Sequence, residues 1–62
     1  MTKSNPGEDI ATFAKRLVSI ANATSKAAVG AYHGTRLVAW PGSTEAEVAH
    51  PWLSATAERY FG

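Results

Sequence analysis

One stretch, residues 27–40, constrains the fold of this chain more than any other. It reads AAVGAYHGTRLVAW and contains one candidate for a tight turn, His33-Gly34. In such a turn the glycine supplies one positive φ, and histidine tolerates the other better than most residues do. A two-residue loop at this point pairs Tyr32 with Thr35 and continues outward toward both ends of the stretch. The stretch therefore predicts an antiparallel β-hairpin.

The two faces of this predicted hairpin are both largely apolar. Because side chains alternate along a strand, one face carries Ala28, Gly30, Tyr32, Thr35, Leu37 and Ala39, and the other carries Ala27, Val29, Ala31, Arg36, Val38 and Trp40. A hairpin in a small monomer normally buries one face and shows a polar face to water. We therefore predict that hairpins from two or more copies pair or stack, so that the chain is a homo-oligomer.

A helix is predicted on the N-terminal side of the hairpin. Asn5 fits its N-cap and Pro6 its first position, and apolar residues then recur at spacings of three and four as far as about Ala23. Residues 1–4 are short and polar, and we expect them to form a frayed tail.

A second helix is predicted after the hairpin. Thr44 and Glu47 match a capping box at its start. Pro51 either kinks this helix or ends a short first turn that a new helix follows. The apolar face from Trp52 to Phe61 is expected to supply most of the bulk of the core.

These elements predict an α+β fold in the order α-β-β-α, with residues 1–62 as a single domain whose sheet or core is completed by homo-oligomerisation. A chain of this size buries only roughly 60% of its unfolded surface. It has no cysteine for a disulfide, and charged residues make up only 18% of it, which is lean for a small monomer. No segment resembles a membrane span or a signal peptide, so we expect a cytoplasmic protein with no membrane partner.

The chain shows no pattern typical of catalysis or of a cofactor. A nucleophile needs a base that a third group orients, and the only aspartate, Asp9, is better explained as a charge at a helix start. Glu45 and Glu47 lie two apart and therefore on different sides of a helix. Neither His33 nor His50 has a metal-ligating residue three or four positions after it. We predict a non-enzymatic protein with no cofactor and no metal site.

Basic residues are concentrated in one half of the sequence, since no acid occurs between Ile10 and Thr44. This asymmetry favours an anionic ligand, for example a nucleotide, bound between subunits. The predicted ligand-binding residues are Arg36, Lys26, Tyr32 and His33, with Lys15, Arg16 or Trp40 in support. The plainer alternative is a solvated helix face and an arginine that lies over Trp40.

In its size, its few charges and its lack of an enzymatic signature, the chain resembles the small accessory proteins that phages encode. Some of these block host defences by binding a protein or by sequestering a nucleotide signal in an oligomer. The resemblance implies a binding function and leaves two partners open, a nucleotide or a host protein bound through exposed aromatic residues. Nucleic-acid binding is a weaker alternative, because four positive charges without a recognisable motif fall short of the usual basic surface.

Overall fold

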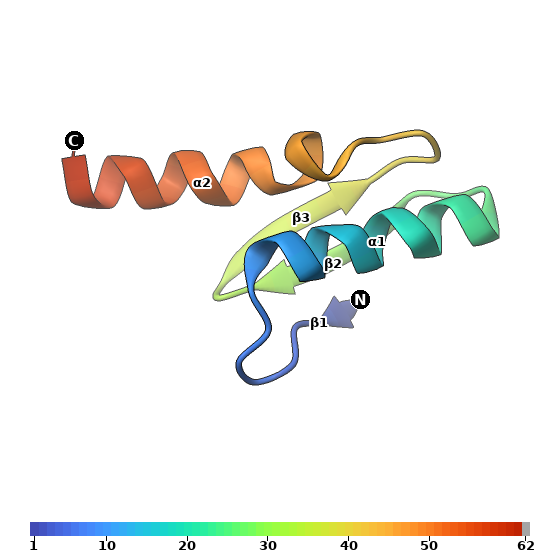
Figure 1. Ribbon diagram of the computed structural model, residues 1–62, viewed down its shortest axis with the longest axis horizontal. Helices are drawn as coiled ribbons and strands as arrows, with labels where there is room; N and C mark the ends of the chain where they lie inside the picture. The colour runs from blue at the N-terminus through green and yellow to red at the C-terminus, as the bar shows by residue number, and fades with distance from the viewer. Residues whose placement is uncertain (62) are drawn as a thin grey trace.

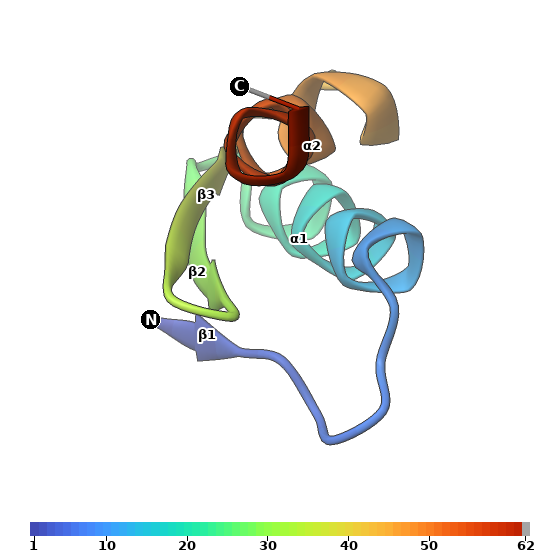
Figure 2. The same ribbon diagram turned by 90° about the vertical axis from the view of Figure 1, so that its left-hand side faces the viewer.

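The computed structural model describes the backbone of residues 1–61 and the side chains of residues 1–59. Its elements, in order, are β1 (Thr2–Lys3), α1 (Ile10–Thr24), β2 (Ala28–Tyr32), β3 (Thr35–Ala39) and α2 (Glu45–Phe61). The strands form one sheet in the order β1-β2-β3, in which β1 is parallel to β2 and β2 is antiparallel to β3. Both helices lie on the same side of this sheet (Figures 1 and 2), which confirms the predicted α+β class.

The predicted hairpin is confirmed, including its register. Tyr32 pairs with Thr35, and the ladder continues to the pair of Ala28 and Ala39. The two turn residues both have positive φ, 46° at His33 and 82° at Gly34. This mirror-image turn matches the right-handed twist of the strands, which is why a two-residue loop closes the hairpin without splaying it.

The helices cover one of the two apolar hairpin faces. On that side Ala28, Tyr32, Leu37 and Ala39 are buried. Gly30 lies directly under α1, because a Cβ placed on it would come within 2.6 Å of the Phe13 ring. The buried core consists of Phe13, Ala14, Leu17, Ala21, Ala28, Tyr32, Leu37, Ala39, Val48 and Ala49. The second apolar face points away from the helices (Figure 2).

The expectation of a frayed tail at residues 1–4 is corrected by the structure. Thr2–Lys3 runs parallel to β2, beside Gly30 and Ala31, and forms the third strand of the sheet. The amide of Ser4 then donates to the carbonyl of Ala31 at 3.4 Å. A parallel strand of two residues leaves no alternating pattern in a sequence, so hydrophobic periodicity gives no signal for it.

The first helix starts later than predicted. Residues 5–8 form a β-turn in which the amide of Glu8 donates to the carbonyl of Asn5 at 3.0 Å and Gly7 has a φ of 80°. A Pro-Gly pair suits the centre of a type II turn better than the first turn of a helix. The helix begins at Ile10 instead, with Asp9 as its N-cap.

The second helix begins where predicted and continues through its proline. The hydroxyl of Thr44 accepts a hydrogen bond from the amide of Glu47 at 3.2 Å, which satisfies one free donor of the first turn. Of the two alternatives at Pro51, the structure shows one uninterrupted helix from Glu45 to Phe61. In Figure 2 the first turns of α2 are offset from the axis of the rest, as expected of a helix bent at a proline.

Among the described side chains, the apolar face after Pro51 does not supply most of the core, contrary to the prediction. Trp52 is only partly buried and Leu53 is 49% exposed. The fully buried bulk comes from Phe13, Leu17, Leu37 and Val48. The reason is visible in Figure 1, where the second half of α2 projects past the end of the sheet. The side chains of Tyr60 and Phe61, which belong to the same predicted face, lie outside the described residues.

Candidate functional site

A cleft of about 320 Å³ lies between the hairpin turn and the second half of α2. It is lined by His33, Thr35, Trp52, Ala55, Thr56 and Arg59. The first two come from the turn and the start of β3. The four helical residues recur at spacings of three and four, which places them on one face of α2. The cleft therefore exists because the projecting helix passes over the hairpin turn.

The aromatic side of this cleft is held in place by Tyr32. The Tyr32 ring packs edge-to-face against both Trp52, at 5.1 Å between centroids, and His33, at 4.3 Å. Its hydroxyl donates to the carbonyl of Glu8 at 2.9 Å. Tyr32 is itself only 5% exposed. It positions the two rings that line the cleft but presents almost no surface of its own to a ligand.

The polar groups around the cleft favour an anion. Arg59 contributes a guanidinium that stays charged and offers donors in a planar fork. Thr35 and Thr56 contribute hydroxyl groups, and the imidazole of His33 can donate a further hydrogen bond. No acidic residue is among the side chains that line it. The arrangement can hold phosphate or carboxylate oxygens, and Trp52 adds an aromatic side chain to the lining.

A second surface of interest is the open face of the sheet, which we define as Lys3, Val29, Ala31, Arg36 and Val38, together with the exposed Trp40 that directly follows β3. It combines two cationic residues with apolar ones. Val38 is 37% exposed and Trp40 is 63% exposed. The amide of Trp40 donates to the Ser43 hydroxyl at 2.9 Å, so a local turn fixes the backbone that carries this exposed ring.

The structure separates the four residues predicted to grip a ligand together. His33 lines the cleft and Tyr32 packs behind it, whereas Arg36 pairs with Ala31 and lies on the open face. Lys26 precedes β2, so it lies on the order of 20 Å along the strand from the turn. Trp40 follows β3 at that distant end. Within one chain, then, only the Tyr32 and His33 part of the predicted cluster is assembled.

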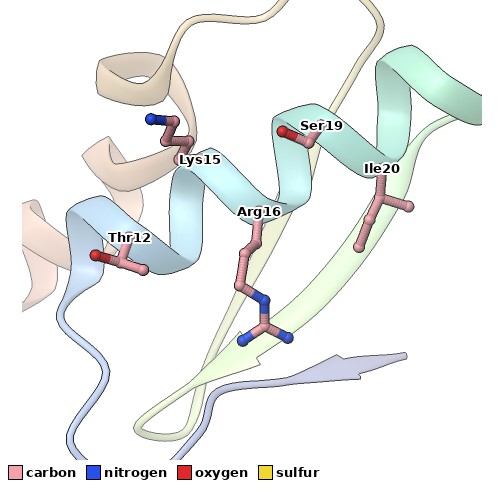
Figure 3. A pocket seen from close by; sticks show the side chains of 5 residues that line it. All are labelled: Thr12, Lys15, Arg16, Ser19 and Ile20. Atoms are coloured by element: carbon pink, nitrogen blue, oxygen red, sulfur yellow. The ribbon is translucent and has the colours of Figure 1, made fainter.

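Lys15 and Arg16 belong to the outer side of α1, where a shallow pocket of about 370 Å³ is also lined by Thr12, Ser19 and Ile20 (Figure 3). Figure 3 shows Lys15 and Arg16 pointing in different directions. Arg16 forms an ion pair with the nearly buried Glu8 carboxylate and donates to the carbonyl of Lys3 at 3.5 Å. Arg16 thus connects α1 to β1 and to the turn between them, which is a structural role.

This connection affects the acid–base behaviour of Glu8. The hydrogen bond from Arg16 is the main cause that lowers the pKa of the Glu8 carboxyl below its ordinary value, and the amide of Asn5 adds to the effect. The pKa of Asp9 is lowered as well, because the amide of Thr12 donates to its carboxylate at 2.7 Å. Both shifts are explained by contacts that hold the start of α1.

Other arrangements that could support chemistry are sparse in the described part of the chain. No three histidine, aspartate or glutamate side chains among the described residues lie close enough together to hold a metal ion. The Ser54 hydroxyl lies 3.5 Å from Nε2 of His50, on the exposed surface of α2. No described carboxylate bonds to this imidazole, so the pair lacks the third group that orients a catalytic base.

The cleft includes five residues that sequence reasoning did not select as ligand-binding: Thr35, Trp52, Ala55, Thr56 and Arg59. The spacing of 52, 56 and 59 along one helix face is visible in the sequence, but Trp52 fits a core position equally well. Only the crossing of α2 over the hairpin turn brings these residues to His33. No sequence pattern encodes that crossing.

Comparison of the chain with models of protein families, with curated proteins and with solved structures gives no significant match. Across the described residues, neither helix has both the length and the apolar character that crossing a membrane requires.

Proposed function

We propose that the chain is a non-enzymatic binding module that works as a homo-oligomer and holds a small anionic molecule in the cleft beside the hairpin turn. One observation carries the proposal: Arg59, His33 and two threonine hydroxyls surround one cleft that no acid lines. An arginine fork can bind two phosphate oxygens at once. The same cleft is lined by Trp52, an aromatic side chain of the kind on which a base can stack.

A nucleotide is the ligand class that suits this combination of groups. The volume of about 320 Å³ lies at the small end of the range for ligand pockets, so it favours a single nucleotide over a large cofactor. In the phage setting that the general resemblance implies, such a protein would act in the host cytoplasm. It would remove a nucleotide signal by binding it and would need no catalytic group, which makes it an anti-defence protein.

Isothermal titration with nucleoside monophosphates, and with inorganic phosphate as a minimal probe, tests the ligand. We expect Arg59→Ala to weaken binding by roughly 10-fold to 150-fold, the value of a hydrogen bond to a charged group. Arg59→Lys should recover only part of it, because an ammonium keeps the charge but loses the fork. The matched control is Arg36→Ala, which removes an arginine from the other side of the sheet.

Two results would contradict this assignment. A titration that gives no heat with any nucleotide or with phosphate would rule out the proposed anionic ligand. Binding that is lost in Arg36→Ala and unchanged in Arg59→Ala would move the site from the cleft to a subunit interface, as the sequence alone suggested.

The exposure of Trp40 supports a second candidate, a protein-binding inhibitor or adaptor. An indole that is 63% exposed beside an apolar strand is typical of interface anchors. A host protein captured by the wild-type chain and by Arg59→Ala, but not by Trp40→Ala, would favour this function. Nucleic-acid binding is less favoured still, since Lys15, Lys26, Arg36 and Arg59 are spread over different parts of the fold.

A further inference from the structure

We infer that the open face of the sheet is a self-complementary interface for a second copy of this chain, related by a two-fold axis that crosses the strands at Val38. The inference goes beyond the proposed ligand, because the cleft lies on the helix side of the sheet. It also replaces a general expectation of oligomerisation with one stated geometry.

The geometry follows from the spacing of three residues on β3 and just after it. Arg36 and Val38 share the open face. Continued alternation places Trp40, the residue directly after β3, on the same face, and successive members are then about 6.6 Å apart. Arg36 and Trp40 are therefore equally far from Val38, in opposite directions. Val29, the β2 partner of Val38, extends the apolar row across the sheet.

A two-fold axis along this row, midway between two stacked sheets, reverses the strands of the second copy. It brings Val38 over Val38 of the second copy and Arg36 over Trp40 of the second copy, twice by symmetry. Each guanidinium then meets the face of an indole, which is the favourable cation–π arrangement. Sheets that stack in this way keep their strands within about 30° of one another, so the residues stay in reach.

Charge selects this axis over the alternative. A two-fold axis parallel to the strands at β3 would place Arg36 over Arg36 of the second copy, with Lys3 and its symmetry mate at the same level. Like charges that face each other oppose association. The arrangement across the strands instead separates the arginines and gives each an aromatic partner.

The size of the face sets the expected strength. Strands of five residues are only about 17 Å long. Three short strands give an area below the roughly 800 Å² that each partner buries in a standard interface. We therefore expect a weak dimer, for which a covalent trap is a better test than a mass measured at low concentration.

The chain has no cysteine, so Val38→Cys places a single thiol on the inferred axis. Disulfides join the stacked sheets of immunoglobulin domains across the same separation. Under mild oxidation we expect Val38→Cys to form a disulfide dimer at least about 10-fold faster than Ser19→Cys, a control thiol on the exposed outer side of α1. Equal rates for the two variants would overturn the interface.

A charge swap in the Val38→Cys background tests the pairing itself. Trp40→Arg should slow dimer formation, because arginine would then face arginine. Adding Arg36→Trp restores an arginine–tryptophan pair with the positions exchanged, and the rate should recover. Both side chains are exposed, so circular dichroism should show folded variants. A rate that Trp40→Arg leaves unchanged, or that the double swap does not recover, would overturn the axis.

If the ligand proposal is wrong and the interface is right, the trapping experiment still gives its expected result. Arg59→Ala in the same background should form the disulfide dimer at the unaltered rate even if no nucleotide binds. Loss of trapping in Arg59→Ala would contradict the separation of the cleft from the open face.

Discussion

At the scale of single residues, Gly30 is the position where the fold least tolerates a larger side chain. It lies between β1 and α1, and an added Cβ would meet Cζ of Phe13 at 2.6 Å, Cδ2 of Leu17 at 3.0 Å and the carbonyl oxygen of Thr2 at 3.0 Å. Of these neighbours, the Thr2 carbonyl is backbone and cannot move without shifting β1. The requirement here is for close approach, since the φ of Gly30 is not among the positive values.

Gly30→Ala should lower the free energy of unfolding by about 1–3 kcal/mol, the usual cost of an extra carbon in a packed core. In a domain of this size that corresponds to a fall in Tm of roughly 5–20 °C. Thermal unfolding followed by circular dichroism measures it. Ala31→Ser, one position along and on the open face, should change the free energy by less than about 0.5 kcal/mol. Equal Tm values for Gly30→Ala and the wild type would mean that α1 lies further from the sheet.

Glu8 should make stability depend on pH in the acid range. Its ordinary pKa of 4.5 is lowered in the fold, mainly by the hydrogen bond from Arg16. The folded state therefore binds the proton less readily than the unfolded state, so the stabilisation is complete above pH 4.5 and is lost as pH falls through the lowered pKa. Glu8→Gln should be less stable than the wild type at neutral pH, and the two should converge in acid.

Melting temperatures across the acid range measure this convergence. Arg16→Met removes the same Arg16–Glu8 hydrogen bond and should show the same convergence with the wild type in acid. If the difference in Tm between Glu8→Gln and the wild type stays constant down to low pH, the charge of the Glu8 carboxylate does not contribute to stability.

At the scale of elements, the hairpin turn carries a histidine at a position where asparagine is the more favourable residue. His33 has a φ of 46°, in the left-handed region where asparagine is favoured over histidine. Asparagine at this position should therefore stabilise the hairpin, whereas a β-branched residue should strain it. Histidine at this position is better explained by the cleft that its ring lines.

His33→Asn should raise the free energy of unfolding by up to about 1 kcal/mol, and His33→Val should lower it by more than about 1 kcal/mol. Chemical denaturation gives both values. If the cleft binds an anion, His33→Asn should also weaken that binding, so that stability and affinity change in opposite directions. A variant that gains stability and keeps full affinity would remove His33 from the site.

At the scale of the whole molecule, the parts predicted correctly are those that local rules determine. The turn at His33-Gly34 and strict alternation define every pair from Tyr32–Thr35 to Ala28–Ala39. A single hydroxyl at Thr44 marks the start of α2. The prediction was wrong at Asn5, where a helix cap and a Pro-Gly turn were both possible: the amide of Asn5 donates to the Glu8 carboxylate at 2.9 Å, and this contact spans the turn at Pro6-Gly7.

The parts that could not be predicted depend on contacts between distant segments. Thr2–Lys3 joins the sheet only because β2 offers an edge there. His33 and Arg59 line the same cleft only because of how far α2 projects past the sheet and of its direction after Pro51. The fold class and hairpin were therefore accessible from the sequence, whereas most residues of the candidate cleft were not.

The shortness of β1 has a consequence for how the sheet opens. Two residues pair in parallel with a partner almost half the chain away, so few hydrogen bonds offset the entropy of closing a long loop. Amide hydrogen exchange should accordingly be fastest at this edge of the sheet. When β1 detaches, the backbone of Gly30 and Ala31 becomes a vacant strand position, and the same fold that completes its own sheet can then accept an extended segment from elsewhere.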